Sequence, residues 1–208
     1  MIKRILVFTF LACSLLLSRN TSAQCLERGN SIIDLSARIG DYNDIYHIHS
    51  ISGAWSSHAG SAIYSLGYEL VVLKWLGIGA QLRYDKYIDS ATQKQTTFSL
   101  NVPVLFNIHF VHTTHVDLYA GMAFGLSTVN YSSNDLTASK YNGIGSLYDI
   151  HAGLRIFLGD HFGLSIPISY TSFSYPSLNY SSPSTSINNW ADLTLGGLNI
   201  GLGLNYKF

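Results

Sequence analysis

Strict alternation of apolar residues with small or polar ones recurs along this chain, and its last run ends on an aromatic carboxy-terminus. From Leu198 to Phe208 every second residue is apolar, and Asn, Gly or Lys stands between. Successive side chains of a β-strand point to opposite faces, so this pattern predicts a strand with one purely apolar face. Because an exposed Phe at a chain end favours aggregation in water, we expect this face to lie against lipid.

Seven further segments alternate in the same way, which predicts eight strands in all. Their apolar positions run through residues 33–39, 64–72, 76–84, 98–108, 116–126, 150–158 and 162–170. The opposite faces of these segments carry glycine, serine and charged residues.

The connections between the segments alternate strictly in length. Long polar connections at residues 40–61, 85–96, 128–145 and 171–192 follow the first, third, fifth and seventh segments, and short turns follow the others. Outer-membrane barrels have short periplasmic turns and longer external loops. The sequence therefore predicts an all-β fold, an eight-stranded antiparallel up-and-down transmembrane β-barrel with both ends in the periplasm.

A soluble lipocalin-like cup is the alternative, with its apolar faces turned inward. The polar faces contain Gly77, Gly79, Gly121, Gly125, Gly153, Gly163, Gly201 and Gly203. Glycine weakens a solvated strand, whereas a crowded lumen needs small residues where chains approach closely. The glycines therefore favour the membrane barrel.

Residues 1–23 have the features of a secretory signal peptide. Two basic residues precede an apolar stretch over residues 5–17, and Ala23 ends a small-x-small cleavage pattern. The stretch is shorter than a transmembrane helix requires. Removal of residues 1–23 leaves residues 24–208 as one barrel domain in which Cys25 is the single thiol. A lipid-modified cysteine is the alternative, and Gln24 disfavours it.

The charge of the chain excludes one class of partner. Charged residues make up 12% of the sequence, with 12 basic and 12 acidic residues. Loss of the signal peptide removes three of the basic residues and leaves the remainder weakly acidic. Since nucleic-acid binding needs a basic patch, we expect no nucleic-acid partner.

Several short motifs resemble the small eight-stranded outer-membrane β-barrel family, in the broad group of the outer membrane protein A, X and W barrels. The motifs are more similar still to a porin-like family. They are Ile32-Ile33-Asp34-Leu35, Tyr68-Glu69, Asp117-Leu118-Tyr119-Ala120-Gly121, Gly153-Leu154-Arg155 and the terminal Lys207-Phe208. The resemblance covers essentially the whole mature chain and implies a location in the cell outer membrane. It also implies that Gly203, Tyr206 and Phe208 form the signal that the barrel assembly machinery reads.

One residue departs from the family pattern. Pro167 stands where such barrels often place an inward acidic residue on the seventh strand. Because proline has no N–H to donate, we also expect a bulge at this position.

Charged residues on the inward faces are the candidate functional residues. They are Asp34, Arg38, Glu69, Arg83, Asp117, His151 and Arg155, with Asp85, His109 and Lys207 on the same faces. Eight strands enclose a lumen that side chains just fill, so these charges must pair. We expect a polar network that plugs the barrel and fixes the strand register. A narrow ion path lined by the same charges is the alternative.

Metal and catalytic sites are disfavoured by the same pattern. Histidines recur at positions 109, 112 and 115 and at positions 47 and 49, but spacing alone does not supply a full ligand set. His58 and Ser61 lie close in a predicted loop with nothing to orient them, and the outward positions are apolar. We therefore expect neither a cofactor nor enzymatic activity.

The remaining signals concern the membrane interfaces and the cell surface. Aromatic residues near the strand ends are typical of interfacial girdles: Tyr64, Tyr84, Phe98, Phe110, Phe162, Tyr170, Tyr206 and Phe208. The loops at 40–61 and 171–192 are candidates for contact with a surface partner, the second being rich in Ser, Tyr and Asn. The sequence thus predicts a non-enzymatic outer-membrane barrel with loops for interaction or envelope integrity, and a narrow porin-like channel is the alternative.

Overall fold

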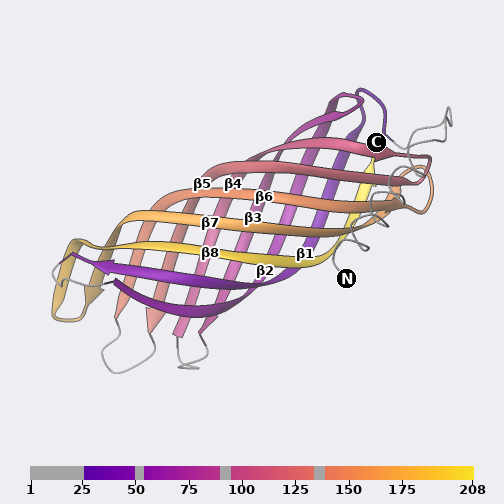
Figure 1. Cartoon of the computed structure of the whole chain (residues 1–208). Helices are drawn as coiled ribbons and strands as arrows, with labels where there is room; N and C mark the ends of the chain where they lie inside the picture. Colours follow the sequence, from indigo (N-terminus) through magenta and orange to yellow (C-terminus); the bar gives the residue numbers. More distant parts are fainter. Residues whose placement is uncertain (1–25, 50–53, 90–94, 134–138) are drawn as a thin grey trace, which may run out of the picture.

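The computed structural model of the chain describes residues 26–49, 54–89, 95–133 and 139–208, and these form a closed antiparallel β-barrel (Figure 1). The strands are β1 (Ser31–Ile48), β2 (Ala54–Leu73), β3 (Leu76–Asp89), β4 (Gln95–His112), β5 (Val116–Ser133), β6 (Lys140–Phe157), β7 (Phe162–Ser182) and β8 (Thr185–Lys207). Each strand pairs with the next, and β1 also pairs with β8. The predicted fold and strand number are confirmed.

The start of β1 and the end of β8 lie at one end of the barrel, together with the three short turns (Figure 1). The backbone N–H of Phe208 donates to the carbonyl of Ser31 at 2.9 Å, and the side-chain amide of Asn30 donates to the carbonyl of Phe208 at 3.2 Å. These bonds fasten the last residue of the chain to the beginning of β1.

The strands extend much further from the termini than predicted. The predicted loop 40–61 is largely the paired ends of β1 and β2, and the predicted loop 171–192 is a hairpin of β7 and β8 interrupted only at residues 183–184. The prediction of long loops at these two places was wrong. Polar outward residues mark these segments as lying beyond the lipid, but apolar residues at their inward positions, such as Tyr42 and Tyr175, are buried and support a continuing strand.

The outer face of the barrel wall is apolar, as the alternation predicts. Leu35, Ile39, Leu126 and Leu202 are 56%, 69%, 69% and 69% exposed. A continuous apolar belt of this kind is stable in hydrocarbon and would be a liability in water. Closure of the barrel pairs the backbone groups of every strand on both sides, which lipid requires.

The lumen consists of three layers. An apolar floor near the termini contains Leu26, Ile32, Val71 and Phe157, all of them buried. Charged and polar side chains fill the middle. The end away from the termini contains a larger apolar cluster: Tyr42, Ala59, Ile63, Tyr87, Val129, Tyr141, Leu147, Phe173, Tyr175, Leu178, Ala191, Leu193 and Leu195. The predicted polar lumen therefore describes only the middle layer.

Pro167 does not produce the predicted bulge. Ser165 pairs with Gly203 and Ile168 pairs with Ile200, so the register between β7 and β8 is the same on both sides of the proline. Ile166 and Pro167 lack pairs on β8, whereas Pro167 still lies opposite Gly153 of β6. The missing N–H thus costs local pairing with one neighbour and leaves the register unchanged.

Two inward glycines show why the lumen needs small residues. A Cβ atom at Gly77 would overlap the carboxylate of Glu69, and one at Gly153 would lie 2.5 Å from the ring of Tyr119. Glycine at these positions makes room for the large polar side chains of the middle layer.

Candidate functional site

Four strands contribute to a compact ion cluster in the half of the middle layer nearer the termini. Arg155 on β6 donates from Nη2 to Glu69 on β2 at 2.6 Å and from Nη1 to Asp117 on β5 at 3.2 Å. His109 on β4 lies between the same two carboxylates, 2.9 Å from Glu69 and 2.8 Å from Asp117. The guanidinium of Arg155 also stacks on the ring of Tyr119 at 4.1 Å. One cation and one imidazole thus bridge two buried carboxylates.

A second cluster surrounds Arg83 of β3, on the side away from the termini. Its guanidinium donates to both carboxylate oxygens of Asp85, at 2.7 and 2.8 Å, in the bidentate arrangement that suits this pair. It also donates to the hydroxyl of Tyr42 at 2.8 Å, to Thr171 at 3.0 Å and to Asp149 at 3.4 Å. Arg83 is 1% exposed, so these bonds replace its hydration.

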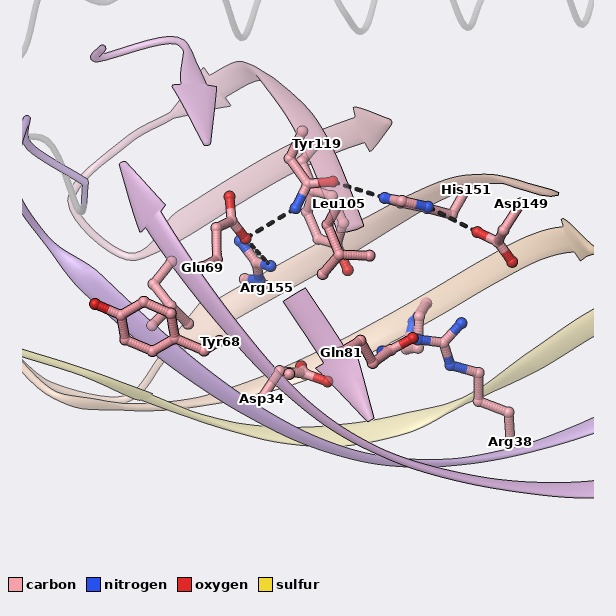
Figure 2. A pocket seen from close by; sticks show the side chains of 14 residues that line it. Asp34, Arg38, Tyr68, Glu69, Gln81, Leu105, Tyr119, Asp149, His151 and Arg155 are labelled. Atoms are coloured by element: carbon pink, nitrogen blue, oxygen red, sulfur yellow. Dashed lines mark hydrogen bonds and ion pairs between the residues drawn. The ribbon is translucent and has the colours of Figure 1, made fainter. Parts of the chain in front are cut away.

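A chain of hydrogen bonds joins the two clusters. His151 lies 2.8 Å from Asp149 on one side and 2.6 Å from the amide oxygen of Asn107 on the other, and the amide nitrogen of Asn107 donates to Glu69 at 2.8 Å. Figure 2 shows this path from Asp149 through His151 to Glu69 and Arg155. With Asn199 of β8 bonded to Thr171 of β7, the network contains side chains from all eight strands.

Both histidines have polar partners at both ring nitrogens. Each ring nitrogen of His109 faces a carboxylate that Arg155 also contacts. The ring of His151 lies between the carboxylate of Asp149 and the amide oxygen of Asn107, whose amide nitrogen donates to Glu69. Both imidazoles are thus held on two sides within the network.

Charges of both signs meet in the middle layer. Its carboxylates belong to Asp34, Glu69, Asp85, Asp117 and Asp149, its guanidinium groups to Arg38, Arg83 and Arg155, and its imidazoles to His109 and His151. Paired and hydrogen-bonded ions are the form in which charge is tolerated in a low-dielectric interior. The two clusters of this layer are thus paired through the side chains of the barrel itself.

A small polar cavity lies beside the network, lined in part by Asp34, Arg38, Gln81 and Arg155 (Figure 2). Its volume is about 30 Å³, which is room for one or two water molecules. The Nε atom of Arg155 is buried without a hydrogen-bond partner among the described residues. A water molecule in this cavity is the natural acceptor for it.

The structure places the seven sequence-predicted lumen residues in different roles. Glu69, Asp117 and Arg155 are in direct contact, and His151 links them to the cluster of Arg83. Asp34 and Arg38 lie beside the cavity with neutral partners only: Asp34 accepts from Ser165 and Asn205, and Arg38 donates to Ser36 and Ser169, within the described part of the chain.

Several members of the network were missed. Asn107, Asp149, Thr171, Tyr42 and Asn199 are all buried members of it. Tyr42 and Thr171 fell in segments predicted as loops, and Asp149 preceded the predicted start of its strand. Continued alternation from Arg155 through His151 was the signal that points to Asp149.

The candidate residues for metal binding and catalysis have other partners or positions where the structure describes them. His109 uses both ring nitrogens for carboxylates, and within the described ranges no group of three His, Cys, Asp or Glu side chains is arranged to hold a metal ion. His58 and Ser61 both lie on β2, where His58 is exposed and Ser61 is buried on the opposite, inward face. The two side chains therefore do not form a dyad.

Comparison with known proteins gives the family. The sequence matches the family described as outer membrane protein beta-barrel domain over residues 9–208, and no curated protein matches the chain. The structure of OprG from Pseudomonas aeruginosa is similar, with 13% identity, a TM-score of 0.60 and coverage of 90% of this chain and 99% of OprG.

The outer membrane protein AlkL, determined in lipid bilayers, is similar with 12% identity, a TM-score of 0.56 and coverage of 92% of this chain and 94% of AlkL. At these identities the likeness shows the fold alone. The resemblance inferred from short motifs is confirmed, and so is the outer-membrane location. The chain belongs to the outer membrane protein β-barrel domain family.

Proposed function

We propose that this protein is a non-enzymatic, non-conducting barrel that acts through its extracellular rim, in contact with a surface partner or in support of envelope integrity. The observation that carries the proposal is the three-layered lumen. An apolar floor and an apolar outer cluster enclose the charged layer, and the cavity beside that layer has room for one or two waters only. An ion path needs continuous hydration, which dry apolar layers oppose.

Among the residues that the structure describes, the wall contains no activated nucleophile, which supports a non-enzymatic role. The large exposed side chains of the belt are apolar, and most polar groups of the lumen bond to each other. A catalytic site needs a base within hydrogen-bond reach of a nucleophile in a space that admits substrate. The central network is therefore assigned a structural role, and outer-membrane lipid is the medium in which it acts.

Single-channel recording tests this function. The folded barrel, selected by heat-modifiable gel mobility, is inserted in a planar bilayer, and we expect no steady openings. Glu69→Ala is expected to lower stability, because Arg155 and His109 lose their shared carboxylate, without opening a path through the apolar layers. Reproducible openings of the unmodified barrel, or altered permeability in a stable Glu69→Ala barrel, would establish the narrow channel instead.

A further inference from the structure

The outer wall of the barrel has two adjoining hollows where β7, β8, β1 and β2 lie next to one another. Their volumes are about 520 and 560 Å³, and they share four lining residues: Ala37, Tyr64, Ile166 and Leu202. Two small outward residues leave this space, because Ala37 lies opposite Tyr64 and Ala62 lies opposite Ile39. Both volumes fall in the roughly 300–1,000 Å³ range of ligand sites. The hollows open on the lipid-facing side of the belt, so an occupant must be soluble in lipid.

The pairing of β7 with β8 is interrupted beside these hollows. The register on both sides would pair Ile166 with Leu202 and Pro167 with Gly201, but both pairs are missing. Pro167 has no N–H to complete the ladder. Ile166 and Leu202 line the outer hollows, whereas Pro167 lines the small polar cavity in the lumen. The wall is therefore least tightly bonded where a hollow lies outside it and a cavity lies inside it.

Arg38 lies directly behind this interruption. It pairs with Gly201 across the seam of β1 and β8, and a Cβ atom on Gly201 would lie 2.7 Å from the Cγ atom of Arg38. The arginine side chain thus lies over the glycine, and its Nη1 donates to Ser169 of β7 at 3.4 Å. Arg38 lines both the lumen cavity and the outer hollow of about 520 Å³. Among the residues that line the two hollows, Arg38 alone is charged.

Arg38 has no carboxylate partner within the described ranges. It donates to the hydroxyls of Ser36 and Ser169, both at 3.4 Å. Asp34, the nearest carboxylate along the same face of β1, accepts from two neutral side chains instead. The other carboxylates of the middle layer are bonded to the other two arginines or to the histidines, and Figure 2 shows Arg38 outside that network. A guanidinium with two long bonds to hydroxyls retains donors for an anion.

We propose that the hollow binds a free fatty acid, with its chain along the apolar lining and its carboxylate on Arg38. A carboxylate matches the paired N–H groups of a guanidinium, and a single acyl chain matches a groove of aliphatic side chains. Arg38 lies between Ala37 and Ile39, which are exposed in the belt, so its depth suits a small carboxylate. The larger head group of a phospholipid would lose its hydration there.

This inference goes beyond the proposed function. The ligand lies on the lipid-facing side of the wall, and the apolar layers of the lumen stay closed. The recording experiment and a binding experiment therefore fail separately.

Photo-crosslinking in the folded full barrel tests the proposal. The barrel is held in lipid nanodiscs with a palmitic acid analogue that has a diazirine in its chain, and the labelled residues are identified by mass spectrometry of peptides. We expect labelling to concentrate on residues of the two hollows, and unlabelled palmitate to compete for it. Hexadecanol has the same chain without the carboxylate and should compete about tenfold more weakly, because it lacks the charge-assisted hydrogen bonds.

Two variants with matched controls separate the two parts of the site. Arg38→Met should weaken competition by palmitate about tenfold, whereas Arg28→Met, at an exposed site before β1, should not. Ala37→Leu should reduce labelling by filling the hollow, whereas Ala120→Leu, at an outward position of β5 that lines neither hollow, should not. Heat-modifiable gel mobility checks that each variant is folded.

Each part of the proposal has a result that overturns it. Labelling spread evenly around the belt would show that the hollow holds no fatty acid. Equal competition by palmitate and hexadecanol, or unchanged competition in Arg38→Met, would remove Arg38 from the site. A phospholipid that co-purifies in the hollow and resists displacement by palmitate would be the occupant instead. Steady conductance in a barrel that still binds palmitate would refute the sealed lumen alone.

Discussion

At the residue scale, the stability of the middle layer on the side away from the termini depends on Arg83. Removing its charge in Arg83→Met leaves the buried carboxylates of Asp85 and Asp149 without their cation, so we expect the free energy of unfolding to fall by about 3–5 kcal/mol. Urea unfolding of the folded barrel in micelles measures this. The double variant with Asp85→Asn should recover part of the loss, because it removes the stranded charge.

Lys86→Met is the matched control, since Lys86 is exposed on the opposite face of β3. Its effect should stay within about 0.5 kcal/mol. If Arg83→Met cost no more than this control, the cluster around Arg83 would contribute nothing to stability.

Gly77 tests how tightly the middle layer is filled. In Gly77→Ala the new methyl group meets the Glu69 carboxylate, which must then leave its partners Arg155 and His109, so we expect a loss of about 1–3 kcal/mol in the same assay. Gly159→Ala is the control, because nothing lies within 4 Å of a Cβ atom there. Equal stability of the two variants would show that the lumen has more free space than the side-chain positions indicate.

Alternation along the sequence places residues such as Glu69, Arg83 and Arg155 in the lumen. A strand with one face in lipid can carry charged side chains only on its other face, which points into the barrel. Which charges meet was not accessible from the sequence, because partners across the barrel depend on strand stagger and tilt. The pairing of Asp149 with Arg83 and the separate position of Asp34 follow from that stagger.

At the scale of the elements, a clasp at the rim away from the termini joins the end of β1 to β8. The ring of His49 lies 2.8 Å from the carbonyl of Asn189 and 2.9 Å from the carboxylate of Asp192. The carbonyl of Asn189 first, and Asp192 second, raise the pKa of His49 above its ordinary value of about 6.5, because both accept from the protonated ring.

The clasp predicts a pH dependence confined to the rim. A raised folded-state pKa means that the stabilisation is fully present below about pH 6.5 and is lost as the pH rises through the raised value. NMR titration of the His49 ring should show this pKa, and Asp192→Asn should move it back toward the ordinary value. Titration of His49 at the same pH in both proteins would contradict the clasp.

The strand ends show where element prediction failed. Polarity marks where the chain leaves the lipid, but it does not mark where strand pairing stops. The hairpin of β7 and β8 continues to the pair Ser182 and Thr185 because its inward side chains, including Tyr175 and Leu178, still have a core to cover. Beyond the lipid only the outward-facing residues of the strand become polar, while the inward-facing residues remain apolar. A prediction based on the number of polar residues therefore mistakes this part of the strand for a loop.

For the whole molecule, closure depends on the carboxy-terminus. We propose that Phe208, with Gly203 and Tyr206, is read by the barrel assembly machinery, since its ring is 60% exposed and lies 4.8 Å from Tyr206 at the periplasmic end. Phe208→Ala should reduce the amount of folded barrel in cells severalfold and leave urea unfolding of the refolded protein within about 0.5 kcal/mol of the unmodified barrel. A parallel drop in both measurements would assign Phe208 to structure alone.

The pairing of charge in the middle layer also bears on how the barrel responds to an electric field. A voltage acts on a membrane protein in proportion to the charge that it can displace, at about 2.3 kcal/mol per elementary charge for 100 mV. In this layer Arg83 is hydrogen-bonded to Asp85 and Asp149, and Arg155 to Glu69 and Asp117, all of them buried. A field across the outer membrane therefore meets ions that are fixed to their partners, and we expect these two clusters to move little when a voltage is applied.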